Sequence, residues 1–180
     1  PCWTAAARLR TLEGMVTFKG TEVHTSGSLP TVGSRAPDFR LTRADLSDVS
    51  LQDFAGKKKV LNIVPSLDTG VCARSAETFD ARAAEVDDAV FLTISKDLPF
   101  AQKRFCTASD ISQVVTLSAM RDTSFGTEYG VTMMDGPMAG IFARAVVVLD
   151  AEDKVVYTQL VPEIAQEPDY ASALDALAKA

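Results

Sequence analysis

Two short stretches of almost continuous apolar residues, 60–64 and 90–95, give the clearest structural signal in the chain. Runs of this length and composition are typical of strands that are covered on both faces. Between them, apolar side chains recur at helical spacing along one face: Cys72, Ala76, Phe79, Ala83 and Val86. Strand, helix and strand in this order predict a right-handed parallel crossover.

The N-terminal part of the chain shows hairpin and connector patterns. Residues 16–24 read as a β-hairpin that is broken at Gly20 and Thr21. Residues 29–37 read as an extended connector, because each proline disfavours a helical conformation of the residue before it.

Two further helices are predicted after the second apolar strand. The first starts at Asp97 and runs towards Cys106, with Asp97 as its N-cap and Pro99 in its first turn, where a missing N–H does no harm. A shorter helical pattern covers residues 122–129.

The C-terminal part reads as a hairpin followed by a helix. Residues 145–149 and 155–159 are strand-like and flank an acidic turn at 150–153. Residues 168–180 form an amphipathic helical pattern, whose apolar positions include Tyr170, Leu174 and Leu177. Together the elements predict an α/β fold in which a mixed sheet carries helices on both faces.

The chain length of 180 residues fits one domain, which we place at residues 15–180. A domain of this size buries roughly 70% of the surface that its unfolded chain exposes. Residues 1–14 contain Arg8 and Arg10 but no apolar core, so they do not read as a secretory signal. We interpret them as an appended remnant or an upstream-start extension without stable structure, in which Cys2 and Trp3 play no part. The expected compartment is the cytoplasm.

Charge and composition exclude several classes of function. The formal net charge of −6 and the pI near 4.8 argue against nucleic-acid binding. The longest basic run, residues 57–59, reads as a solvated turn. No segment approaches the roughly 18–20 apolar residues of a membrane span. With three cysteines and His24 as the one histidine, the chain predicts neither a disulfide scaffold nor a structural metal site, and we expect no cofactor.

Cys72 lies where chemistry is expected. Residues 65–72 connect a buried strand to a helix, and loops at this edge of an α/β sheet commonly hold functional sites. In the first helical turn, free backbone N–H groups and the helix dipole stabilise a thiolate. A free cysteine is only about 3% thiolate at pH 7, so a reactive one needs such help. Position alone nevertheless favours a simpler interpretation, a buried and inert cysteine.

The sequence around Cys72 changes that balance. Residues 65–72 read PSLDTGVC, which resembles the peroxidatic loop of the peroxiredoxins, in the form Pro-x-x-x-Thr-x-x-Cys. Three further segments resemble the bacterial thiol peroxidase branch, an atypical two-cysteine group of that family: residues 95–106 (SKDLPFAQKRFC), residues 136–140 with 143–148, and residues 160–170. The resemblance covers residue 15 to the C-terminus. It implies a thioredoxin-like fold with an N-terminal β-hairpin.

The resemblance implies a role for each of five residues. Cys72 would be the peroxidatic nucleophile and Cys106 the resolving cysteine that forms a disulfide with it. Thr69 would hydrogen-bond the sulfur and the peroxide oxygens, and Pro65 would shield the thiolate from water. Arg144 would stabilise the thiolate and the charge that develops on the peroxide. Taken singly, Arg144 also fits a surface charge at the start of a strand, and Cys106 fits a helix residue packed beside its neighbours.

The resemblance also implies a substrate and partners. Hydrogen peroxide and organic hydroperoxides would be the substrates, thioredoxin the reductant, and a homodimer the assembly. Apolar residues near Arg144 are compatible with organic substrates: Met133, Met138, Ile141 and Phe142. A disulfide requires Cα atoms within about 7 Å. Because both cysteines are predicted on separate helices, we expect at least one helix end to unwind when the disulfide forms.

Two other functions remain open on the sequence. One is a thioredoxin-like binding or chaperone module whose cysteines are not catalytic; the chain has no CxxC motif, which disfavours a disulfide oxidoreductase. The other is a cysteine–histidine hydrolase, for which His24 would be the base, but no acidic partner for it can be assigned from the sequence.

Overall fold

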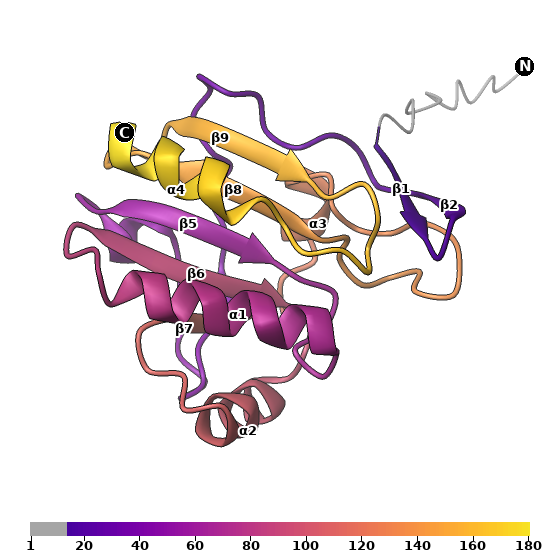
Figure 1. Ribbon diagram of the computed structural model, residues 1–180, viewed down its shortest axis with the longest axis horizontal. Helices are drawn as coiled ribbons and strands as arrows, with labels where there is room; N and C mark the ends of the chain where they lie inside the picture. Colours follow the sequence, from indigo (N-terminus) through magenta and orange to yellow (C-terminus); the bar gives the residue numbers. More distant parts are fainter. Residues whose placement is uncertain (1–13) are drawn as a thin grey trace, which may run out of the picture.

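Within residues 14–180, which the computed structural model describes, a mixed seven-stranded sheet forms the centre of the protein (Figure 1). The strand order is β4-β3-β7-β6-β5-β8-β9. The bounds are β3 (Leu41–Thr42), β4 (Asp48–Val49), β5 (Lys58–Ile63), β6 (Ala89–Ser95), β7 (Val115–Ser118), β8 (Ala145–Leu149) and β9 (Val155–Leu160). The predicted α/β class is therefore confirmed.

The crossover predicted from the two apolar runs is present. β5 and β6 pair in parallel, and α1 (Gly70–Ala83) connects them. Cys72, Ala76 and Phe79 are buried on the inner face of α1, as the periodicity predicts. Val86 lies beyond the end of α1, although it still packs against the same core.

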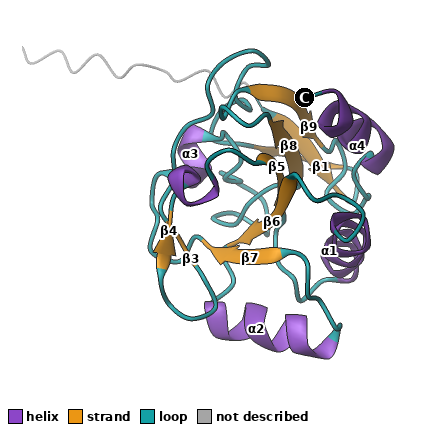
Figure 2. Cartoon of the chain, turned by 90° about the vertical axis from the view of Figure 1, so that its left-hand side faces the viewer, coloured by secondary structure: helices purple, strands orange, loops and turns teal. Residues whose placement is uncertain are grey.

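Helices lie on both faces of the sheet (Figure 2). α1 and α4 (Tyr170–Lys179) cover one face, α3 (Phe125–Glu128) lies on the other, and α2 (Pro99–Ala108) packs along β7. Side chains of β5 alternate between the two sides: Val60 joins the core under α1 and α4, whereas Leu61 and Ile63 join the core on the side of α3. This period of two is that of a strand that is buried on both faces.

The N-terminal hairpin consists of β1 (Met15–Phe18) and β2 (Thr21–His24), which pair in an antiparallel register. Its turn is at Lys19 and Gly20, which have φ angles of 51° and 80°. A two-residue turn with both φ angles positive matches the twist of the flanking strands. The predicted break at Gly20 and Thr21 is therefore wrong by one residue, since Thr21 begins β2.

Three short strands were not predicted. β3 and β4 have two residues each, and β7 has four. Segments this short show neither alternation nor an apolar run. They extend the sheet beyond β6, and β7 provides the surface on which α2 packs.

The prediction for the basic run is wrong. Lys58 and Lys59 begin β5, and Lys59 is fully buried with its ammonium group paired to Asp153. Burial of a lysine is tolerated when a carboxylate compensates its charge. The acidic turn between β8 and β9 therefore supplies the counter-charge for the start of β5.

None of the helices among residues 14–180 combines the length and the apolar character needed to cross a membrane.

The predicted N-terminal extension, with Cys2 and Trp3, lies outside the described residues apart from Gly14. This glycine is buried, and its carbonyl accepts a hydrogen bond from the Thr25 N–H.

Candidate active site

Cys72 lies in the first turn of α1, at the carboxyl edge of the sheet. Thr69 is the N-cap residue of α1 and adopts an extended conformation, so that Cys72 is the third residue of the helix. Its side chain is fully buried. Cys72 lies at this edge because β5 ends at Ile63 and only the short segment 64–69 separates β5 from α1. The free N–H groups of the first turn create positive potential at this end of the helix.

The Thr69 hydroxyl contacts the sulfur. Its Oγ1 lies 2.8 Å from Cys72 Sγ and 3.0 Å from the carbonyl oxygen of Ser66. A hydroxyl has one proton to donate. It can therefore donate to the Ser66 carbonyl while a thiol donates to it, or turn and donate to a thiolate. The same side chain serves both protonation states of Cys72.

The Arg144 guanidinium also contacts the sulfur. Its Nη2 lies 3.3 Å from Cys72 Sγ. Nε and Nη2 each donate to the Ile164 carbonyl at 3.1 Å, which fixes the plane of the guanidinium. Nη1 is buried and has no hydrogen-bond partner within the described part of the chain. Arg144 is 1% exposed, so the alternative of a surface charge is wrong.

The pairing of β5 with β8 explains why these two residues meet. The antiparallel register places Ala145 opposite Ile63, at the end of β5. Arg144 immediately precedes β8, so its position in the sheet is next to the segment that leads into α1. A residue 72 positions away in sequence is thereby held against Cys72.

A cavity of about 210 Å³ opens beside the Cys72 loop. Pro65, Thr69 and Arg144 border it, and its apolar wall comes from three other segments: Phe18 of β1, Met138 of the turn before β8, and Ile164 after β9. In Figure 1 the hairpin that carries Phe18 lies at the end of the sheet towards which β5 and β6 point. Of the four apolar residues expected near Arg144, only Met138 borders the cavity, whereas Met133 and Phe142 are core residues. No local signal in the sequence marks Phe18 or Ile164.

Glu163 connects the hairpin to the segment that holds Arg144. Its carboxylate accepts hydrogen bonds from the Thr17 hydroxyl at 2.7 Å and from the N–H groups of Lys19 and Gly20 in the hairpin turn. The bond from Thr17 and one from the Ala165 N–H lower the pKa of Glu163 most, and with those from the hairpin turn they bring it to about 2. The next residue, Ile164, supplies the carbonyl that orients Arg144.

Asp97 does not cap α2 as predicted. Leu98 is the N-cap residue, and Pro99 occupies the first turn as expected. The Asp97 carboxylate instead accepts hydrogen bonds from the Ser66 hydroxyl at 2.7 Å and from the Leu67 N–H at 2.8 Å. It is therefore bonded to the loop that precedes Cys72.

Cys106 lies on α2, away from the cavity. Its Sγ is 3.8 Å from Thr116 Oγ1 of β7, and both Cys72 and Cys106 are free thiols. The preceding residue, Phe105, packs against the small cluster that contains Cys72. The structure thus places α2 close to the Cys72 environment through Phe105, while Cys106 itself faces β7.

Burial raises the pKa of the Cys106 thiol above its ordinary value of 9.0; the Asp80 carboxylate acts in the same direction, and the Thr116 hydroxyl opposes it. We expect Cys106 to be alkylated half-maximally only above pH 9.0 in a folded variant that lacks Cys2 and Cys72. Folding raises the pKa of Cys106, so the protonated thiol is favoured in the folded state. The stability that this thiol contributes is fully present below pH 9.0 and is lost as the pH rises through its pKa in the folded protein. A half-maximal rate at or below pH 9.0, followed by mass spectrometry, would contradict the expectation.

The structure gives His24 the acidic partner that the sequence did not reveal. His24 Nδ1 lies 2.7 Å from Asp135, and both side chains are substantially exposed. Neither residue borders the cavity beside the Cys72 loop. This pair therefore gives no support to a hydrolase centred on Cys72.

Comparison with known proteins identifies the family of the chain. Residues 31–174 match the Redoxin family model. The chain is 57% identical over 162 residues to proteins named thiol peroxidase from Mycobacterium tuberculosis and Mycobacterium bovis, an alignment that covers 90% of this chain and 97% of theirs. A peroxiredoxin-like protein from Aquifex aeolicus has 38% identity and a TM-score of 0.87, covering 92% of this chain and 96% of that one. A thiol peroxidase structure from Chromobacterium violaceum shares the fold, with a TM-score of 0.83 at 21% identity, over 93% of this chain and 98% of that one. The chain therefore belongs to the redoxin family, in the thiol peroxidase branch of the peroxiredoxins.

Proposed function

We propose that this thiol-dependent peroxidase reduces hydrogen peroxide and organic hydroperoxides through a sulfenic acid at Cys72 and a disulfide between Cys72 and Cys106, which thioredoxin reduces. The observation that carries the proposal is the position of one buried sulfur. It contacts the Thr69 hydroxyl and the Arg144 guanidinium beside a cavity, and it lies in the first turn of a helix.

In the first step, the Cys72 thiolate attacks the terminal oxygen of the hydroperoxide. The S–O bond forms as the O–O bond breaks, the sulfur is oxidised to a sulfenic acid, and the alkoxide leaves as an alcohol after it takes up a proton. Donors aimed at the developing negative charge lower the barrier of such a step. Arg144 Nη1 is a buried donor that has no partner among residues 14–180, and Thr69 Oγ1 is a second donor beside the sulfur.

Two features of the cavity lining support the first step. Pro65 is buried and borders the cavity, which is consistent with its proposed role in keeping water from the thiolate. The apolar wall formed by Phe18, Met138 and Ile164 suits the carbon chain of an organic hydroperoxide.

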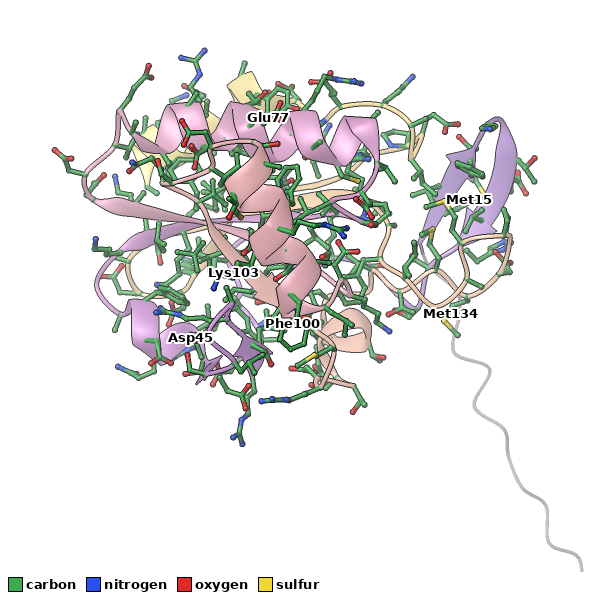
Figure 3. All side chains as sticks on the ribbon, turned by 90° about the horizontal axis from the view of Figure 1, so that it is seen from below. Met15, Asp45, Glu77, Phe100, Lys103 and Met134 are labelled. Atoms are coloured by element: carbon green, nitrogen blue, oxygen red, sulfur yellow. The ribbon has the colours of Figure 1, made fainter. Side chains whose placement is uncertain are left out.

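In the second step, the thiol of Cys106 condenses with the sulfenic acid. The S–S bond forms and one water molecule leaves. Cys72 is buried in α1 and Cys106 faces β7 from α2, so we propose that the start of α1, the end of α2 or both unwind for this step. The outer face of α2 is open to solvent: Phe100 and Lys103 are exposed along it (Figure 3).

The reductant and the assembly belong to the proposal on the strength of family resemblance. A dithiol protein such as thioredoxin would attack the disulfide and return both cysteines to thiols. We propose a homodimer in the cytoplasm as the working form. Gel filtration with light scattering tests the dimer, and a coupled assay with thioredoxin and its reductase tests the partner.

Intact mass spectrometry after one equivalent of hydroperoxide tests the two-cysteine cycle. In a Cys2→Ser background, we expect the folded protein to lose the mass of two hydrogens. With Cys106→Ser added, we expect a gain of one oxygen at Cys72. A mass that stays unchanged in both proteins would contradict the cycle and would favour a thioredoxin-like binding module instead.

A further inference from the structure

The Asp97 carboxylate links the ends of the strands that surround the site. It accepts hydrogen bonds from the Ser66 hydroxyl at 2.7 Å, the Leu67 N–H at 2.8 Å and the Ser95 hydroxyl at 2.8 Å. Ser66 and Leu67 belong to the loop before α1, and Ser95 is the last residue of β6. Asp97 itself lies two residues before α2, the helix that carries Cys106.

A continuous chain of hydrogen bonds runs from Asp97 to the reactive sulfur. Ser66 donates its hydroxyl to Asp97, and its carbonyl accepts bonds from the N–H of Thr69 at 3.2 Å and from the Thr69 hydroxyl at 3.0 Å. Thr69 Oγ1 in turn lies 2.8 Å from Cys72 Sγ. The position of the Thr69 hydroxyl, and with it the first turn of α1, therefore depends on where Asp97 holds Ser66.

The same aspartate is fixed on its other side. The Ser118 hydroxyl of β7 donates to the Asp97 carbonyl at 2.6 Å. Ser95 Oγ, which donates to the Asp97 carboxylate, accepts a bond from Gln102 Nε2 of α2 at 3.0 Å. Gln102 is fully buried, so this attachment is part of the folded core. Asp97 thus joins the Cys72 loop to the helix of Cys106.

We propose that Asp97 is a positioning residue that holds the Cys72 loop in its folded, peroxide-reactive form and thereby sets how long the Cys72 sulfenic acid persists before the disulfide forms. This inference rests on the two-cysteine cycle proposed above. Among the described contacts Asp97 does not touch the Cys72 sulfur, and it does not border the cavity; it acts through Ser66 and Thr69.

Two reactions compete for the sulfenic acid. Condensation with the Cys106 thiol forms the S–S bond and releases water. Attack by the sulfur on a second hydroperoxide instead breaks its O–O bond, gives a sulfinic acid at Cys72 and releases an alcohol. Where the start of α1 is the helix end that unwinds, the first reaction takes place outside the folded loop, whereas the second takes place within it. A bond that stabilises the folded loop therefore favours the second reaction at a given peroxide concentration.

Asp97→Asn tests the inference because it keeps the size of the side chain while it removes the charge and replaces one acceptor oxygen by a donor. Hydrogen bonds to a charged group are the stronger ones, so we expect disulfide formation to accelerate by about tenfold. The fraction of Cys72 converted to sulfinic acid under excess hydroperoxide should fall accordingly. Rapid acid quench and intact mass spectrometry measure both quantities.

Asp68→Asn is the matched control. Asp68 lies in the same loop and also faces α2, but its carboxylate is exposed and only approaches Arg104 at 3.7 Å. We expect it to leave both quantities at wild-type values. Ser66→Ala removes one bond of the chain and should shift both quantities in the same direction as Asp97→Asn. Ser66→Thr, which keeps the hydroxyl, should restore the wild-type rate of disulfide formation and the wild-type fraction of sulfinic acid.

The outcomes distinguish a failure of the two-cysteine cycle from a failure of the proposed role of Asp97. If wild-type protein forms no disulfide, the two-cysteine cycle itself is wrong. Suppose instead that wild type forms the disulfide, but Asp97→Asn and Ser66→Ala give the same rate of disulfide formation and the same fraction of sulfinic acid as Asp68→Asn, or more sulfinic acid. In that case Asp97 does not hold the loop. Should Asp97→Asn fail to fold, the pair Ser66→Ala and Ser66→Thr decides the question.

Discussion

Replacing Cys72 by serine is expected to abolish turnover of hydroperoxide. A serine hydroxyl is not ionised near neutral pH, and it cannot form the sulfenic acid on which the cycle depends. Thr69 and Arg144 would still be in place, but the thiolate that they contact in the wild type would be missing. A loss of at least about a thousandfold in the thioredoxin-coupled rate should follow, since the thiolate is the reacting species.

The control for this variant is Cys106→Ser, which retains the nucleophile. When mixed with one equivalent of hydroperoxide it should consume that equivalent, whereas Cys72→Ser should consume none. Peroxide consumption in Cys72→Ser at more than a small fraction of the wild-type rate would mean that another residue is the nucleophile.

Replacing Arg144 by methionine is expected to slow the reaction of Cys72 with hydroperoxide by about a hundredfold, the usual loss when one preorganised donor is removed from a site of developing charge. Methionine fills similar space but has no donor for the sulfur, the Ile164 carbonyl or the substrate. The rate constant of the first step, measured by competition with a reference thiol, reports this loss directly.

Arg144→Lys separates charge from geometry. Lysine keeps the positive charge but lacks the planar fork that holds two bonds to Ile164. We expect an intermediate rate. Arg74→Ala removes an exposed cation of α1, which pairs with Glu167, and should leave the rate unchanged. Equal rates for Arg144→Met and Arg74→Ala would refute a role of the buried guanidinium.

Much of the fold could be predicted from local pattern. The apolar runs that became β5 and β6, the face of α1 and the C-terminal helix α4 are all long enough for their period to be read. The position of Cys72 in the first helical turn followed from that pattern, because the loop between a buried strand and its helix is short.

Other features depend on contacts between distant segments. β3 and β4 are too short to carry a period, and they exist because β7 offers an edge for pairing. The basic run gave no sign that Lys59 would be buried against Asp153, since that contact requires β5 and β8 to be neighbours. Asp97 matched the composition of an N-cap, but its carboxylate is bonded to a loop about thirty residues earlier in the chain.

For the candidate site, the sequence allowed a prediction of the residues that would carry the chemistry, but not of the apolar wall. The loop motif identified Cys72, Thr69 and Pro65, and the resemblance added Arg144. The apolar wall was missed because Phe18 and Ile164 stand on segments at opposite ends of the sequence. Their meeting depends on the hydrogen bonds between the hairpin and the segment after β9, which leave no trace in local composition.

The hydrogen bonds of Glu163 make the attachment of the hairpin to the segment after β9 depend on pH. Hydrogen bonds from Thr17 and the hairpin turn keep this carboxylate ionised down to a pH of about 2, well below its ordinary value of 4.5. Because its pKa is depressed on folding, its stabilising contribution is complete above that ordinary value and disappears only as the pH falls towards about 2. Acid would therefore loosen this attachment of the hairpin only gradually, as the pH falls below 4.5.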